Sequence, residues 1–125
     1  MTKAAFNILR VGVAVTFLWI GLLIFKDPVS WTGYIGDWAQ DLMVLDAVAV
    51  MTLTGIFDMI IGLWLLLDYK VWIPASLATL HLASVIVVSG INSITVRDIG
   101  LLAASLALFF DSAPNSFLRA VKIQK

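Results

Sequence analysis

Two titratable side chains lie inside long apolar stretches of the sequence: Asp58 and His81, the only histidine in the chain. A charged group near the centre of a membrane span costs roughly 2.5–3.5 kcal/mol on insertion scales, so such residues usually pair with each other or serve a function. At about 1.5 Å of rise per residue, Asp58 lies ~13 Å and His81 ~15 Å from the same end of two consecutive helices. We therefore expect the carboxylate and the imidazole to meet near mid-membrane.

Two interpretations of this pair remain open. In the first, the two groups satisfy each other's hydrogen bonds and fix the register of their helices. In the second, they share or relay a proton, or hold the polar headgroup of a quinone or another lipid. A metal held by His81 and Asp58 alone would lack ligands. We therefore expect no metal site. We also assign no catalytic residue and expect no cofactor bound by this chain alone, and quinone or lipid remain candidate ligands.

Other charged residues lie near the ends of the apolar stretches and can be paired by the same depth comparison. Asp46 lies level with Arg97 and Asp98 on one side of the membrane, and Arg10 lies level with Asp111 on the other. These five residues are candidates for charge pairs or for contacts with another subunit. Arg10 can also extend its side chain to the membrane boundary, and Asp98 suits the positive end of a helix.

The elements that must position these residues are apolar helices. Of the 125 residues, 62% are hydrophobic and 13% are charged, whereas a soluble domain is about half apolar and a quarter charged. A transmembrane helix needs about 20 apolar residues, which predicts four spans at about 8–25, 42–67, 71–89 and 96–111. The segment between the first two is rich in aromatic residues and is predicted to be a short interfacial helix or loop.

Short connections make neighbouring spans antiparallel, so the predicted fold is an all-α up-down bundle. It would form a single domain over residues 1–125. Glycines within the second span, Gly55 and Gly62, and the small residues that begin at Gly100 in the fourth would let helices approach closely, either inside the bundle or against another subunit.

The distribution of basic residues predicts the orientation. One side of the membrane would carry six of them and the other side two; the six are Lys3, Arg10, Lys70, Arg119, Lys122 and Lys125, and the two are Lys26 and Arg97. We therefore expect a multi-pass protein of the plasma membrane with both termini in the cytoplasm.

Charge and cysteine content exclude several functions. The formal net charge is zero, so the chain lacks the basic field that attracts nucleic acid, and no nucleic-acid partner is expected. The sequence contains no cysteine, which excludes disulfides, thiolate catalysis and iron–sulfur ligation by this chain.

Three stretches carry a resemblance to a known family: an opening that runs from Arg10 to the Lys26-Asp27-Pro28 stop, the segment 57–67 with its central carboxylate, and the segment 97–108 that begins Arg-Asp-Ile-Gly-Leu. Together with four short spans, they resemble the DoxX family over about residues 8–112. That family usually carries a glutamate where this chain has Asp58, so a role that needs the longer side chain is in doubt.

The resemblance implies a small membrane protein associated with redox systems. Our first hypothesis is an accessory subunit of a larger membrane oxidoreductase or monooxygenase, close to quinone or lipid and not catalytic on its own. The alternative is a stand-alone DoxX-like membrane oxidoreductase or transporter for a lipophilic small molecule. The expected partners are membrane lipids and either other membrane subunits or further copies of this chain.

Overall fold

The computed structural model describes residues 1–116 and is helical throughout that range, without β-strands. Its elements in chain order are α1 (Lys3–Lys26), the 3-10 helix η1 (Pro28–Tyr34), α2 (Asp37–Leu42), α3 (Ala47–Leu66), α4 (Trp72–Ser89) and α5 (Thr95–Ser112). The four long helices overlap the four predicted apolar stretches. Arg119, Lys122 and Lys125, which entered the orientation argument, lie outside the described residues.

Among the described residues, three helices are long and apolar enough to cross a membrane: α1, α3 and α4. The remaining long helix, α5, is as long as α4, with 18 residues. It carries three charged residues, however: Arg97 and Asp98 in its first turn and Asp111 near its end. Its charged residues therefore lie near its two ends, and the turns between them are mainly apolar.

The second long helix begins later than the apolar run that predicted it. Asp46 adopts an extended backbone conformation, and its carboxylate accepts a hydrogen bond of 2.9 Å from the backbone N–H of Ala49. This arrangement is an N-cap, which satisfies one of the free N–H groups at a helix start. The first residues of the apolar run belong instead to the end of α2 and to the connection between α2 and α3.

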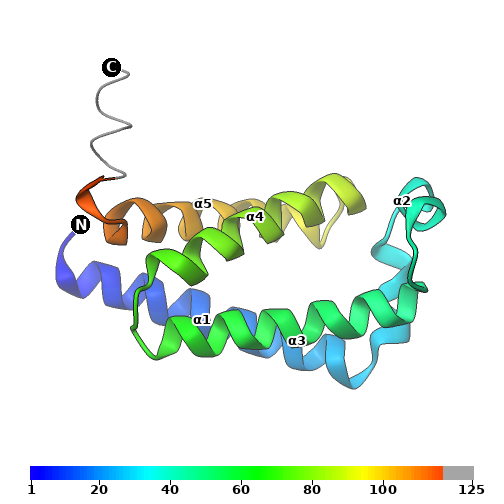
Figure 1. Cartoon of the computed structure of the whole chain (residues 1–125), viewed down its shortest axis with the longest axis horizontal. Helices are drawn as coiled ribbons and strands as arrows, with labels where there is room; N and C mark the ends of the chain where they lie inside the picture. Colours follow the sequence, from blue (N-terminus) through cyan, green and yellow to red (C-terminus); the bar gives the residue numbers. More distant parts are fainter. Residues whose placement is uncertain (117–125) are drawn as a thin grey trace, which may run out of the picture.

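The long helices form two closely packed pairs, α1 with α3 and α4 with α5. Figure 1 shows the N-terminus, the α3–α4 connection and the last turn of α5 at one end of the molecule, and η1, α2 and the α4–α5 turn at the other. Contact between the pairs is sparser, and α3 touches α4 much less than it touches α1. The two pairs enclose the buried core, which includes Phe17, Ile61, Leu65 and Leu108.

Glycines allow the first pair to pack closely. A Cβ atom at Gly62 would lie 2.7 Å from the backbone nitrogen of Leu18 and 2.8 Å from the carbonyl oxygen of Ala14. At Gly55 a Cβ atom would lie 2.9 Å from the carbonyl oxygen of Gly21. The predicted small-residue face of the second span therefore packs inside the molecule, against α1. By contrast, Gly100 on α5 is exposed and has open space around it.

The segment between α1 and α3 packs against the ends of these helices. Ile35 and Ala39 are buried and form a second core cluster with Ile24 of α1 and Met51 of α3. The backbone N–H of Gly36 donates a 3.1 Å hydrogen bond to the carbonyl of Val88 near the end of α4. This segment therefore connects the two helix pairs at one end of the molecule.

Candidate functional site

The structure brings Asp58 of α3 and His81 of α4 into direct contact. The imidazole Nε2 lies 2.9 Å from Oδ1 of the carboxylate, and the side chains are 16% and 7% exposed, respectively. The ring of Phe57 meets the imidazole edge-on, with centroids 5.0 Å apart. An imidazole and a carboxylate at this distance can share a proton.

This pair lies in a cavity of about 300 Å³ that extends toward the end of the molecule covered by η1. All four long helices contribute to its wall, as does η1. One part of the lining is polar and the rest is apolar. The polar part includes Thr54, Asp58, His81, Thr95, Arg97 and Asp98, and the apolar part includes Phe17, Ile24, Trp31, Met51, Leu82 and Leu101.

Arg97 and Asp98 belong to the same cavity as the Asp58–His81 pair, although the sequence suggested two separate places. Asp98 is 7% exposed, whereas Arg97 is exposed. The carboxylate of Asp98 interacts electrostatically with Arg97, Asp58 and His81. The cavity therefore combines two buried carboxylates, one imidazole and one guanidinium within a mainly apolar wall.

A tight turn positions this start of α5. Gly90 ends α4 with a φ of +70°, a conformation that glycine adopts readily. The side-chain oxygen of Asn92 then accepts hydrogen bonds from the backbone N–H groups of Ile94 and Thr95. The hydroxyl of Thr95 in turn donates to the carbonyl of Gly90 at 2.6 Å. These bonds fix the first turn of α5, and with it the buried carboxylate three residues after Thr95.

Sequence reasoning missed the contribution of η1 to the cavity. The aromatic segment that contains Trp31 and Tyr34 was predicted to be interfacial; in the structure both residues also line the cavity, with their rings 5.6 Å apart. The signal was present as a dense group of aromatic residues. It could not show that the segment folds back over the helices, because that depends on the buried Ile35 and on the Gly36 hydrogen bond.

The structure does not join Asp46 to Arg97 or Asp98. The side chain of Asp46 caps α3, and no salt bridge within residues 1–116 includes Arg97. The two were predicted to be neighbours because they lie at the same depth. Equal depth does not make two residues adjacent, since each can point to a different side of the bundle.

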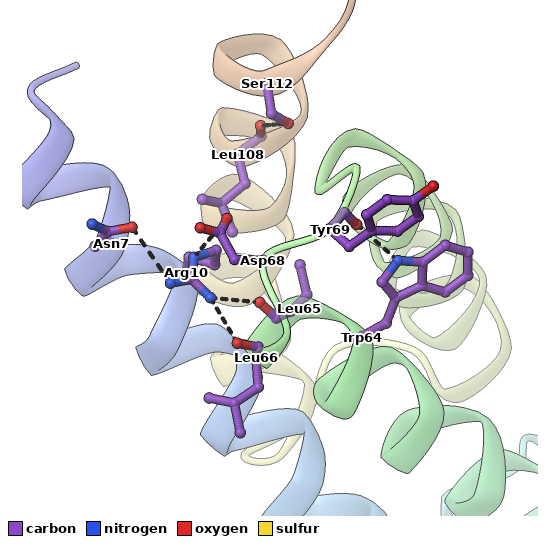
Figure 2. A network of polar contacts seen from close by, with 9 residues as sticks. All are labelled: Asn7, Arg10, Trp64, Leu65, Leu66, Asp68, Tyr69, Leu108 and Ser112. Carbon is purple, nitrogen blue, oxygen red and sulfur yellow. Dashed lines mark hydrogen bonds and ion pairs between the residues drawn. The ribbon is translucent and has the colours of Figure 1, made fainter.

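Arg10 likewise has a partner other than the predicted Asp111. Its guanidinium Nη1 donates to the carbonyl oxygens of Leu65 at 2.7 Å and Leu66 at 3.1 Å, and its Nε lies 3.4 Å from Oδ1 of Asp68. Figure 2 shows how these groups surround the buried Arg10 at the end of α3. Asp111 instead lies 3.5 Å from the amino group of Met1. Arg10 thus satisfies the last carbonyls of α3, where a positive charge is favourable.

Within the described part of the chain, no group of three or more His, Cys, Asp or Glu side chains is arranged to hold a metal ion. The cavity offers donors and acceptors of hydrogen bonds, a carboxylate and an imidazole in contact, and a mainly apolar wall. Pockets of this character, largely apolar with a few convergent polar groups, are typical of small-molecule sites. The arrangement can therefore bind a molecule with one polar end.

Comparisons with known proteins identify the family. A family model described as DoxX matches residues 5–91, which include α1 from its third residue onward and all of η1, α2, α3 and α4. The match ends before α5, so the resemblance noted at 97–108 lies outside it. No curated protein and no solved structure matches the chain. Because the matched region covers well over half of the sequence, the chain is a member of the DoxX family.

Proposed function

We propose that this DoxX-family protein is an accessory subunit of a larger membrane redox complex, in which its cavity holds the polar head of a lipophilic redox molecule such as a quinone. The observation that carries the proposal is the Asp58–His81 pair within a mainly apolar cavity. An imidazole N–H is a suitable donor to a quinone carbonyl, and the surrounding apolar wall suits the ring.

Proton transfer is the chemistry that these residues can supply. Reduction of a quinone to a quinol takes up two electrons and two protons. Asp58 and His81 can share one proton and pass it to a carbonyl oxygen of the ring; the pair is then reprotonated from water and supplies the second proton in the same way. Both electrons come from a redox group on a partner subunit. This division of labour makes the chain a binding and proton-handling subunit.

The proposal includes four crossings of the plasma membrane, with α5 as the fourth. An 18-residue helix is about 27 Å long, close to the ~30 Å thickness of the hydrocarbon core. In this orientation Arg97 and Asp98 lie at the outer boundary, Asp111 lies at the inner boundary, and both termini are cytoplasmic. A fluorescent protein fused to the C-terminus should fluoresce, and alkaline phosphatase fused there should be inactive. The reverse pattern would exclude a fourth crossing in this direction.

Fluorescence quenching tests the binding site directly, because Trp31 lines the cavity. The protein in phosphatidylcholine nanodiscs is titrated with a tail-free benzoquinone, and the saturable part of the tryptophan quenching is measured. Asp58→Asn and His81→Leu should weaken saturable binding by about tenfold or more, the effect expected when a hydrogen-bonding site loses a buried partner.

Two controls make the titration decisive. Trp31→Phe should remove most of the saturable signal, whereas Trp19→Phe, on the exposed face of α1, should retain it. Quenching that never saturates, or that is equal in the wild type and in both site variants, would refute binding at Asp58 and His81.

Gentle solubilisation tests the accessory role separately. An affinity-tagged chain isolated from its native membrane should bring larger redox subunits with it in fixed proportion. Isolation of a discrete homo-oligomer that turns over a quinone unaided would favour the stand-alone enzyme instead.

A further inference from the structure

A groove lies on the outer side of the seam between α3 and α4, where these helices contact each other only sparsely. Its apolar floor comes from α3, and His81 of α4 closes its other side. Leu53, Ile56 and Ile60 in this floor are 55%, 37% and 55% exposed. In a membrane, such a face is open to the hydrocarbon chains of the bilayer.

The groove and the inner cavity share part of their lining. Val50, Thr54 and His81 line both. The imidazole that contacts Asp58 inside the cavity is therefore also exposed toward the groove, and its side chain is 16% exposed overall. The Asp58–His81 pair thus lies where the partly polar cavity meets the apolar groove.

The volume of the cavity limits how much of a ligand it can enclose. The cavity measures about 300 Å³, at the lower end of the range found for small-molecule pockets, ~300–1,000 Å³. It can therefore enclose a single ring or a similar head, but a head that carries a long hydrocarbon chain needs a second space. The groove supplies that space, and its lining of Leu53, Ile56, Phe57 and Ile60 matches a chain without polar atoms.

We infer that the ligand is a single-tailed amphiphile that enters sideways from the bilayer through the α3–α4 seam. Its head occupies the cavity beside Asp58 and His81, and its isoprenoid or alkyl tail passes His81 and lies along Leu53, Ile56 and Ile60. The inference rests on the proposed function for the head and adds the tail, its path and the route of entry.

The test uses a benzoquinone that carries a ten-carbon tail with a photoreactive diazirine at its end, in nanodiscs of phosphatidylcholine. After irradiation, the labelled residues are mapped by mass spectrometry. Label should concentrate on α3 between residues 50 and 60, and an excess of the tail-free benzoquinone should displace it.

A matched pair of variants tests the path. Ile60→Trp fills the groove, whereas Leu63→Trp adds the same bulk one turn along on a residue that is 52% exposed and lies outside the groove lining. Ile60→Trp should weaken binding of the tailed quinone by about tenfold while leaving tail-free binding unchanged, since filling a hydrophobic site excludes its ligand. Leu63→Trp should change neither.

The outcomes separate the two proposals. If tail-free quinone binds in the cavity, but Ile60→Trp has no effect and label spreads over all lipid-facing helices, the tail path is wrong and the head site stands. If label on α3 is insensitive to the tail-free quinone and equals that from a photoreactive phospholipid, the groove is an ordinary lipid contact and the inference is refuted. If the tail-free quinone does not bind at all, both proposals are refuted.

Discussion

Gly62→Ala would place a methyl group where α1 and α3 pack closely against each other. The new carbon would lie 2.7 Å from the backbone nitrogen of Leu18 and from its Cγ, and 2.8 Å from the carbonyl oxygen of Ala14. Ordinary van der Waals contact begins near 3.4 Å, so the two helices must separate locally by about 0.7 Å. Two of these three neighbours are backbone atoms, which cannot rotate away as a side chain can.

The expected cost follows from two opposing effects. Overpacking a close interface by a methyl group typically costs about 1–3 kcal/mol. Alanine has the higher helix propensity, which offsets up to about 1 kcal/mol. With that offset, we expect Gly62→Ala to lower the free energy of unfolding by up to about 2 kcal/mol.

Unfolding of the protein in mixed micelles by increasing mole fractions of sodium dodecyl sulfate, followed by circular dichroism, measures this change. Gly12→Ala on α1 is the matched control, because a Cβ atom there has no neighbour within 4 Å, and it should be neutral or stabilising. Equal effects of the two substitutions would mean that α1 and α3 do not approach as closely as the structure shows, and the account of their packing would be wrong.

Three further substitutions test other parts of the fold. Arg10→Met removes the side-chain donors to the last carbonyls of α3 and should lower the free energy of unfolding by about 1.5–3 kcal/mol in the same assay. The control Asp68→Asn should lower it far less, because the Asp68 side chain is 55% exposed. Equal losses from the two substitutions would contradict the role assigned to the Arg10 donors. Gly36→Ala places a Cβ atom 2.8 Å from the carbonyl oxygen of Val88 and should speed amide hydrogen exchange in η1 and α2; unchanged exchange would show that this contact does not hold the segment. Lys70→Gly should raise the melting temperature, because the φ of +42° at this residue costs a residue with a side chain about 1–2 kcal/mol; a lower melting temperature would argue against the turn geometry.

The contact between Asp58 and His81 was predictable because the prediction depends on only two quantities. A fixed rise per residue and one short connection place both residues at the same depth on consecutive helices. The C-terminal ends of the long helices were predictable for a similar reason, since apolar runs stop at charged residues, proline or glycine. The starts of α1 and α3 were not, because α1 begins at Lys3 and α3 at Ala47, whereas the apolar runs suggested about 8 and 42. The family match over residues 5–91 agrees with the resemblance noted from the sequence.

The partner of Arg10 was not predictable by the same means. Depth arithmetic gave Asp111, but it contains no information about which way a side chain points around its helix. The actual partner, Asp68, lies just beyond α3 and has a φ of +56°. This left-handed conformation turns the chain at the point where the carboxylate meets the guanidinium, and neither spacing nor hydropathy encodes that turn.

The cavity was also beyond reach of the sequence, because its wall is assembled from all four long helices and from η1. Its polar residues could be named one by one, including Asp98 at the start of α5. Their convergence depends on how far the two helix pairs stand apart, and that distance is set by side-chain packing over the whole molecule. The predicted pairing of Asp46 with Arg97 failed for the reason given for Arg10, because equal depth does not show which way a side chain points.

The α1–α3 pair and the α4–α5 pair contact each other only sparsely, and both contribute to the wall of the cavity. Any molecule in the cavity therefore contacts both helix pairs and links them. A molecule that binds only when the two pairs are assembled adds about 2.7 kcal/mol to their stability at one hundred times its dissociation constant. Detergents used for purification are themselves single-tailed amphiphiles. Under the proposed function, a detergent or lipid that occupies the cavity should therefore raise the melting temperature of this protein, and this measurement can serve as a screen for molecules that bind there.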